Sequence, residues 1–168
     1  MMKSNMNTEE LLKLLDELGI EFHYYEHGRM ETMEDSIEFN AKLNCVVCKN
    51  CFVKKRKGNE FFMILMPYQK RFVAKEYVAL GYPKCEFAKS EDMERLLSIP
   101  EGVTPLALIN DKNNEVRLLI DDEYKDLDYM CMHPLRCDAT VHINFQDFVN
   151  KFLPYAHHEP EFIKILGE

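Results

Sequence analysis

The sequence predicts a single α/β domain in which helices surround a mixed, strongly twisted and barrel-like β-sheet. Segments with the apolar spacing of amphipathic helices alternate along the chain with short apolar runs that are typical of strands. Two pairs of these runs are separated by turn-forming residues, which favours β-hairpins and therefore antiparallel pairs in the sheet. No low-complexity linker, internal repeat or shift in composition divides residues 1–168, so we expect one domain that covers them all.

The composition is that of an ordinary globular protein, with 46% hydrophobic and 30% charged residues. The formal net charge of −8 argues against a broad, non-specific grip on nucleic acid, which requires a predominantly basic face. Residues 54–57, Lys-Lys-Arg-Lys, are an exception at the tip of a predicted hairpin. They form either a small basic patch or a charged turn that keeps the hairpin soluble.

The sequence favours a cytoplasmic protein. It contains no uninterrupted run of about 18 apolar residues that could span a membrane. The N-terminal segment carries several acidic residues, which is not typical of a signal peptide. In such a chain we expect the six cysteines to be free thiols rather than disulfides.

The N-terminal part is predicted to begin with a helix. Asn7 is suited to cap it, because Glu10 three residues later completes a capping box, and Gly19 is suited to end it. The next expected elements are a strand over residues 20–25, an acidic helix over 31–41, and a hairpin whose strands lie within residues 44–66 and are joined by the turn 57–59.

The remaining elements continue the alternation of helices and strands. Residues 106–109 are very apolar and precede the turn residues 110–114, so we expect them to form a second hairpin with residues 116–120. Ser90 and Asn144 are suited to cap the helices that follow them. The other expected elements are helices over 71–80, 91–97 and 145–153, and strands over 85–88, 139–143 and 160–166.

Lys49 is the residue that fits its predicted surroundings least. It stands in the middle of a strand that is otherwise rich in Val, Phe and Cys. Burial of its ammonium group without a partner would cost several kcal/mol. The side chain therefore either points to solvent or lines a pocket that supplies polar groups or anions.

Cys45, Cys48 and Cys51 have a spacing that could bind zinc or an iron–sulfur cluster if the backbone curled around the metal. The segment is predicted to be a strand, however, and a strand alternates its faces. Cys45 and Cys51 would then share a face with Lys49, while Cys48 points the other way. We therefore expect no metal site here, and we expect the cysteines to act as small buried hydrophobes.

Several segments have an order along the chain and a residue sequence that suggest a family. They are residues 14–20 with Glu26-His27, Cys48-Lys49-Asn50-Cys51-Phe52, Pro67-Tyr68-Gln69-Lys70-Arg71, Phe87-Ala88, residues 102–111 (Gly-Val-Thr-Pro-Leu-Ala-Leu-Ile-Asn-Asp), His133-Pro134 and Ala139-Thr140-Val141. Over nearly the whole chain they resemble the YbaK-type, prolyl-tRNA-synthetase-associated editing domains, which include ProX-like deacylases that act alone. The central and C-terminal segments are the specific ones.

The resemblance implies a hydrolase that cleaves the ester between an amino acid and the terminal ribose of a mischarged tRNA, with alanyl-tRNA of proline as the expected substrate. The expected partners are the 3′ aminoacyl-adenosine end of that tRNA and, as a second candidate, prolyl-tRNA synthetase; DNA and membranes are not expected partners. No metal or other cofactor is implied, because a positioned water and preorganised hydrogen-bond donors can act on an already activated ester.

The resemblance also assigns roles to residues. Lys49 matches the lysine that the family needs for activity, and Asn50 follows it in the same signature. The loop residues Gly102, Val103, Thr104 and Pro105 match a loop whose backbone amides face the aminoacyl carbonyl, and His133 and Asp138 fall where the family lines its substrate pocket.

Three departures from the family pattern leave alternatives open. Glu101 stands where the family often has the loop glycine. Cys137-Asp138 replaces the usual Asn-Thr, and residues 28–32 lack the Pro-rich, aromatic sequence that is typical of the family. One alternative is an inactive or weak editing-like domain that regulates by binding a tRNA or a synthetase. Another, of a different class, is a thiol- or metal-dependent sensor that uses Cys45, Cys48 and Cys51.

Overall fold

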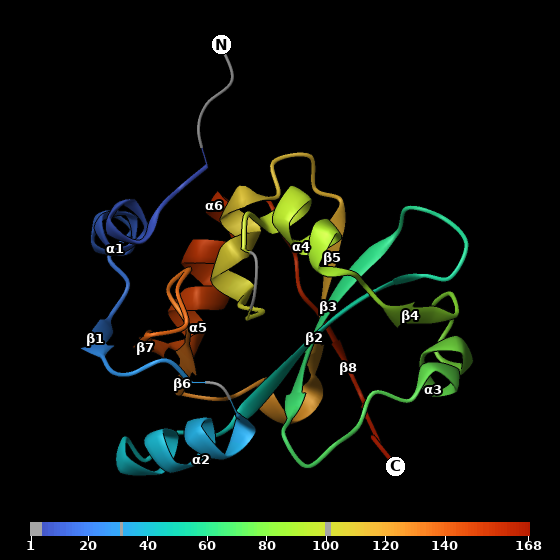
Figure 1. The fold of residues 1–168 in the computed structure, drawn as a ribbon, viewed down its shortest axis with the longest axis horizontal. Coiled ribbons are helices and arrows are strands. Elements are labelled where there is room, and N and C mark those ends of the chain that lie inside the picture. The colour runs from blue at the N-terminus through green and yellow to red at the C-terminus, as the bar shows by residue number, and fades with distance from the viewer. Residues whose placement is uncertain (1–4, 31, 100–101) are drawn as a thin grey trace.

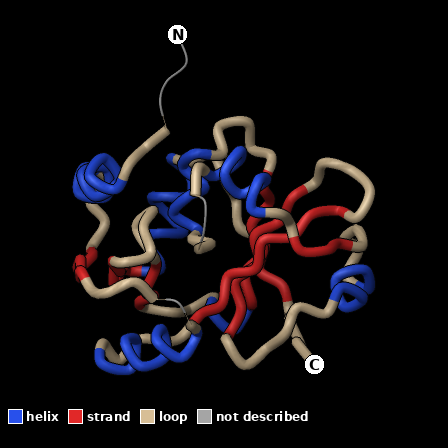
Figure 2. Tube along the Cα trace, viewed as in Figure 1, coloured by secondary structure: helices blue, strands red, loops and turns tan. Residues whose placement is uncertain are grey.

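The computed structural model describes residues 5–30, 32–99 and 102–168, and it confirms the predicted α/β class with a mixed sheet. The strands are divided between two sheets, one of five strands and one of three (Figures 1 and 2). Helices lie around both sheets, and Figure 1 shows the smaller sheet on the side of the molecule where α1 lies. Among the described residues, none of the helices is both long and apolar enough to cross a membrane.

The five-stranded sheet is built on the predicted hairpin of β2 (Cys48–Lys55) and β3 (Phe61–Pro67), which is confirmed as an antiparallel pair. The strand β5 (Val116–Asp121) runs parallel to β3, and β8 (Glu161–Ile163) runs parallel to β5. The short strand β4 (Cys85–Phe87) pairs only with the end of β2 near the hairpin turn. The N-terminal half of β2 therefore has a strand partner on one side only.

The three-stranded sheet is antiparallel, with β7 (Ala139–Asn144) between β1 (Phe22–Glu26) and β6 (Tyr129–Met132). The helices are α1 (Thr8–Glu17), α2 (Met33–Lys42), α3 (Ala74–Ala79) and α4 (Ser90–Leu97), followed near the C-terminus by α5 (Phe145–Asp147), a π-helical turn (Phe148–Phe152) and α6 (Leu153–Tyr155). The capping box of Asn7 and Glu10 is confirmed at the start of α1.

Two hydrophobic clusters hold these layers together. The larger cluster joins the inner faces of the two sheets and includes buried residues of β3, β5, β6 and β7 together with α1, α4 and the C-terminal helical segment. The smaller cluster covers the opposite face of the five-stranded sheet beneath α3. Because β3 alternates between the two clusters, both of its faces are buried, which explains its continuous run of apolar residues.

The predicted second hairpin is wrong. Residues 105–110 form a 3-10 helix (Pro105–Asn110), not a strand, and β5 pairs in parallel with β3. The Thr104 hydroxyl accepts a hydrogen bond from the Leu106 N–H, and Pro105 occupies the first helical position, where its missing N–H costs nothing. A short apolar run does not distinguish a buried strand from a buried helical turn. Here the Thr104 cap and Pro105 favour the helical turn.

Other boundaries also differ from the prediction. The strand expected from residue 44 begins at Cys48, because Asn44 has a positive φ of 53° after the end of α2. Ser90 is the first residue of α4 and Lys89 is its cap. The strand β6 was not predicted, since it lies after the acidic residues 121–128 and is only four residues long. The cap at Asn144 is confirmed, with its side-chain oxygen 2.9 Å from the Asp147 N–H.

We expect Asn144→Ala to lower the free energy of unfolding by about 1 kcal/mol, because the C-terminal helical segment would lose the acceptor for one of its free N–H groups. Urea denaturation measures the change. Asn113→Ala, in an exposed turn, is the matched control and should change stability by less than about 0.5 kcal/mol. Equal effects of the two substitutions would contradict the capping role of Asn144.

Candidate functional site

The strand β2 presents its two faces to different parts of the molecule. Cys48 packs against the larger cluster, whereas Cys51 belongs to the smaller cluster on the other side of the sheet. This agrees with the prediction that Cys48 and Cys51 face in opposite directions. By the alternation of a strand, Asn50 shares the face of Cys48 and Lys49 shares the face of Cys51. The charge of Lys49 accordingly lowers the pKa of the Cys51 thiol, although burial outweighs it and the pKa is raised overall.

A small cavity opens on the Cys48 face of β2, between that strand, α2 and the strands β6 and β7. Its volume is about 50 Å³, and it is lined by Met30, Ser36, Asn40, Cys48, Asn50, Cys131, Met132, His133 and Thr140. A larger depression of about 310 Å³ lies over the turn after the 3-10 helix, but it contains none of the predicted site residues. The small cavity is therefore the candidate site.

Asn50 connects this cavity to the predicted substrate loop. Its Nδ2 donates a hydrogen bond to the backbone carbonyl of Val103 at 2.9 Å, and its Oδ1 accepts a weak hydrogen bond from the Cys48 thiol at 3.7 Å. Asn50 and Val103, which the resemblance assigned to the substrate site, are therefore in direct contact. The bond to Val103 uses one of the two Nδ2 hydrogens, so Asn50 keeps one N–H and its oxygen for other partners.

The remainder of the loop is well anchored. Gly102 has a φ of +76°, a conformation that favours glycine. Glu101, where the chain departs from the family pattern, lies outside the described residues. Thr104 and Pro105 are buried at the start of the 3-10 helix, where Thr104 acts as a cap. Thr104 and Pro105 thus position the loop from within the protein core.

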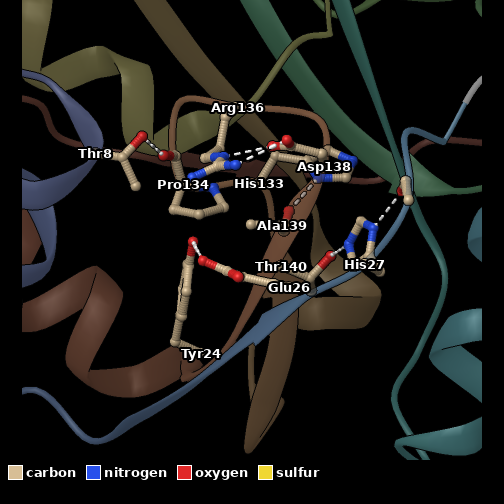
Figure 3. Close-up of polar contacts among 11 residues, drawn as sticks. Thr8, Tyr24, Glu26, His27, His133, Pro134, Arg136, Asp138, Ala139 and Thr140 are labelled. Atoms are coloured by element: carbon tan, nitrogen blue, oxygen red, sulfur yellow. Dashed lines mark hydrogen bonds and ion pairs between the residues drawn. The ribbon is translucent and has the colours of Figure 1, made fainter.

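His133 follows directly after β6 (Figure 3), and it lines the cavity. Its Nδ1 is 2.9 Å from the carbonyl oxygen of Ala139, and a carbonyl can only accept, so Nδ1 carries a hydrogen. Burial lowers the pKa of His133, which favours the neutral ring. In that form Nε2 holds a lone pair, and His133 can accept a hydrogen bond from a ligand.

His27 is a site residue whose role the sequence did not reveal. It lies just after β1, and its Nε2 is 2.8 Å from the Oγ1 of Thr140, which lines the cavity (Figure 3). Its Nδ1 is 2.6 Å from the carbonyl oxygen of Gly28, and its ring centroid lies 6.3 Å from that of His133. The only signal in the sequence was the pair Glu26-His27 in a segment that resembles the editing domains.

Asp138 forms a bidentate ion pair with Arg136 on the loop that precedes β7 (Figure 3). Arg136 lowers the pKa of Asp138 to about 2, so the carboxylate is ionised at neutral pH. Asp138 does not line the cavity; its backbone carbonyl accepts a hydrogen bond from the His27 N–H. Its predicted contact with the substrate stays a prediction.

Lys49 is likewise absent from the residues that line the cavity. It is half-buried, and it lies in the part of β2 that has no strand partner opposite β3. Lys49 is therefore next in sequence to two cavity residues, Cys48 and Asn50, but on the other face of the strand. Its catalytic role stays a prediction.

The three closely spaced cysteines do not form a cluster in the structure. Cys48 and Cys51 lie on opposite faces of β2, and Cys45 precedes the strand, where it forms a hydrogen bond with Cys131 of β6. Among the residues that the structure describes, no three His, Cys, Asp or Glu side chains are arranged to hold a metal ion.

The cysteines should differ in reactivity, because the thiolate is the form that reacts with alkylating agents. The hydrogen bond from Cys131 lowers the pKa of Cys45, while burial raises that of Cys48 to about 12. We expect iodoacetamide at pH 8 to modify Cys45 and to leave Cys48 unmodified in the folded protein, as peptide mass spectrometry would measure. In urea, all six cysteines should react. Equal rates at Cys45 and Cys48 in the folded protein would contradict this assignment.

Comparisons with known proteins agree on one family. Residues 27–151 match the model of the aminoacyl-tRNA editing domain. The chain is 24% identical to the prolyl-tRNA editing protein ProX of Acetoanaerobium sticklandii, over 83% of this chain and 86% of that protein. It is 29% identical to the prolyl-tRNA synthetase associated domain-containing protein 1 of Danio rerio, over 90% and 84%. The crystal structure of the hypothetical protein APE2540 has a similar fold, with a TM-score of 0.66 and 15% identity over 93% of this chain and 98% of that one.

Proposed function

Because the chain belongs to the family of aminoacyl-tRNA editing hydrolases, we propose that it hydrolyses the ester of mischarged tRNA of proline, with alanyl-tRNA as its main substrate. The observation that carries this proposal is the small polar cavity between Asn50 and His133. A volume of about 50 Å³ suits a small side chain such as the methyl group of alanine and disfavours larger ones.

The proposed reaction depends mainly on how the protein positions a water molecule and hydrogen-bond donors around the ester. An aminoacyl ester is already activated, so a bound water can attack its carbonyl when backbone donors stabilise the negative charge that develops on the carbonyl oxygen. The N–H groups of Gly102, Val103 and Thr104 are the proposed donors. The hydrogen bond from Asn50 to the Val103 carbonyl supports this role, because it holds the loop against the cavity. No step in this scheme requires a metal.

Lys49 is proposed to be the catalytic cation of the site. Because it lies on the face of β2 opposite the cavity, its partner would be a phosphate or ribose oxygen of the terminal adenosine rather than the amino acid side chain. In this arrangement the aminoacyl group enters the cavity on one side of the strand, while the nucleotide passes along the strand edge that β4 leaves open. The ammonium group would hold the nucleotide while the ester is attacked.

The partner in this proposal is the 3′ end of a mischarged tRNA. Among the basic residues 54–57, Lys54 and Lys55 end β2, and Arg56 and Lys57 follow it in the turn. They could contact the phosphate backbone of the acceptor stem, although the net charge of the chain is negative. Prolyl-tRNA synthetase, which would supply the mischarged tRNA, is proposed as a second partner.

The test is a deacylation assay on tRNA of proline charged with alanine, cysteine, serine or proline. We expect alanyl-tRNA to be hydrolysed fastest and prolyl-tRNA to be spared, because the pyrrolidine ring exceeds the cavity. Hydrolysis of none of the four, together with retained tRNA binding, would favour the alternative of an inactive editing-like domain that acts as a regulator. Fast hydrolysis of prolyl-tRNA would contradict selection by size.

A further inference from the structure

The contacts of His27 determine which of its ring nitrogens carries the hydrogen. The Gly28 carbonyl, 2.6 Å from Nδ1, can only accept, so Nδ1 must donate. In the neutral ring, Nε2 then has a lone pair and accepts, and its partner at 2.8 Å is the Thr140 hydroxyl. The hydroxyl hydrogen of Thr140 is therefore committed to His27, and the lone pairs of its oxygen remain for another donor.

Two other polar side chains of the cavity, those of His133 and Ser36, also donate their hydrogens to protein atoms. His133 donates its Nδ1 hydrogen to Ala139, and Asn50 donates one of its two Nδ2 hydrogens to Val103. The Ser36 hydroxyl donates to the sulfur of Met30 at 3.6 Å. These side chains offer several lone pairs to a ligand: the Nε2 of His133, the hydroxyl oxygens of Ser36 and Thr140, and the Oδ1 of Asn50 beside its second amide hydrogen.

We propose that this cavity recognises the α-ammonium group of the aminoacyl ester and that His27 is the positioning residue which makes Thr140 an acceptor. The inference rests on the proposed function, since it concerns the same site. An ammonium group carries three N–H donors and a positive charge, so it complements the lone pairs of His133, Ser36, Thr140 and Asn50. The ester carbonyl is itself an acceptor, so it pairs with the backbone amides of the loop rather than with these lone pairs.

The burial of Thr140 strengthens the argument. Only 3% of this residue is exposed, so its hydroxyl cannot exchange partners freely with water. The ring of His27 packs against that of Phe39 with centroids 4.6 Å apart, which holds the imidazole on the outer side of Thr140. Figure 3 shows His27 reaching Thr140 from the end of β1, while His133 lies on the neighbouring loop. A fixed acceptor needs a partner that takes its hydrogen and is itself held in place, and the contacts of His27 with Thr140 and Phe39 provide both.

The test uses two analogues that cannot be hydrolysed, adenosine with a 3′-alanylamido group and adenosine with a 3′-propionylamido group. They differ only in the α-amino group. We expect the wild-type protein to bind the alanyl analogue about tenfold more tightly, as a charged hydrogen bond would allow, in calorimetric titrations. If the wild-type protein bound the two analogues with equal affinity, that result alone would overturn the inference.

Four variants examine the roles of the two residues. Thr140→Val keeps the shape but removes the hydroxyl, and His27→Ala removes its partner, so both should lose most of the preference for the alanyl analogue. Thr140→Ser keeps the hydroxyl, and His27→Gln can place an amide oxygen near the position of Nε2, so both should retain much of it. Thr8→Val is the matched control, because the Thr8 hydroxyl is bonded to the Pro134 carbonyl outside the cavity, and it should leave the preference unchanged.

A double substitution distinguishes a positioning role from an independent one. If His27 acts through Thr140, His27→Ala should cause no further loss of preference in the Thr140→Val protein. A further loss as large as that of His27→Ala alone would overturn the positioning role. Preferential binding of the alanyl analogue without any deacylation would contradict the proposed function only, whereas deacylation without this preference would overturn only the present inference.

Discussion

Lys49→Ala is expected to reduce the hydrolysis of alanyl-tRNA by about 100-fold or more. In the proposed scheme the ammonium group holds an oxygen of the terminal adenosine in the transition state, and the loss of one preorganised electrostatic donor typically costs this much in rate. The fold should be unaffected or slightly more stable, because Lys49 is half-buried and no salt bridge to it is found among the described residues.

The measurement combines kcat/KM for alanyl-tRNA with the melting temperature of the same protein. Lys49→Arg keeps the positive charge with a different shape and should recover part of the activity. Lys13→Ala, on the exposed side of α1, is the matched control and should change neither quantity. Full hydrolytic activity in Lys49→Ala would refute the proposed role, and a large fall in melting temperature would indicate a structural lysine instead.

The fold class could be predicted from the sequence because local signals and packing agreed over most of the chain. The β2–β3 hairpin combines strong strand propensity with a turn, and Asn7 and Asn144 are unambiguous caps. Agreement failed at residues 105–110, where an apolar run in a buried position can satisfy either a strand or a helical turn. The parallel pairing of β5 with β3 depends on contacts distant in sequence, and no local pattern encodes it.

Part of the candidate site could also be predicted from the sequence, and part of it could not. The resemblance to a family led to Asn50, the loop at 102–105 and His133, and the structure brings Asn50 into contact with the loop and with the cavity that His133 lines. The faces of β2 could be predicted from strand alternation, but whether the cavity lies on the side of Asn50 or of Lys49 depends on where the second sheet packs. The hydrogen-bond direction between His27 and Thr140 requires the position of the Gly28 carbonyl, which only coordinates provide.

Asp111→Ala is expected to cause a large loss of stability. Asp111 ends the segment 102–111 that carries much of the family resemblance, yet its surroundings indicate a structural role. Only 3% of the residue is exposed. Its carboxylate accepts hydrogen bonds from the N–H groups of Glu115 and Val116 at 3.0 and 2.8 Å, and it lies 2.9 Å from Nε2 of the buried His158.

These contacts join three parts of the fold, namely the 3-10 helix, the start of β5 and the segment after α6. Removal of the carboxylate would leave several buried donors without an acceptor, so we expect a loss of about 3 kcal/mol or more in the free energy of unfolding. Asp111→Asn should cost less, because the amide keeps one oxygen acceptor. Asp126→Ala, in an exposed turn, is the control and should stay within about 0.5 kcal/mol of the wild type.

Urea denaturation of the three variants measures these differences, and deacylation by the folded fraction separates stability from chemistry. Asp111 lies outside the small cavity, so Asp111→Ala should retain near-normal kcat/KM per folded molecule at low temperature. Lys49→Ala should show the opposite pattern, with stability retained and activity lost. If Asp111→Ala unfolded no more easily than Asp126→Ala, the hydrogen bonds that link Asp111 to His158 and β5 could not be what holds these three segments together.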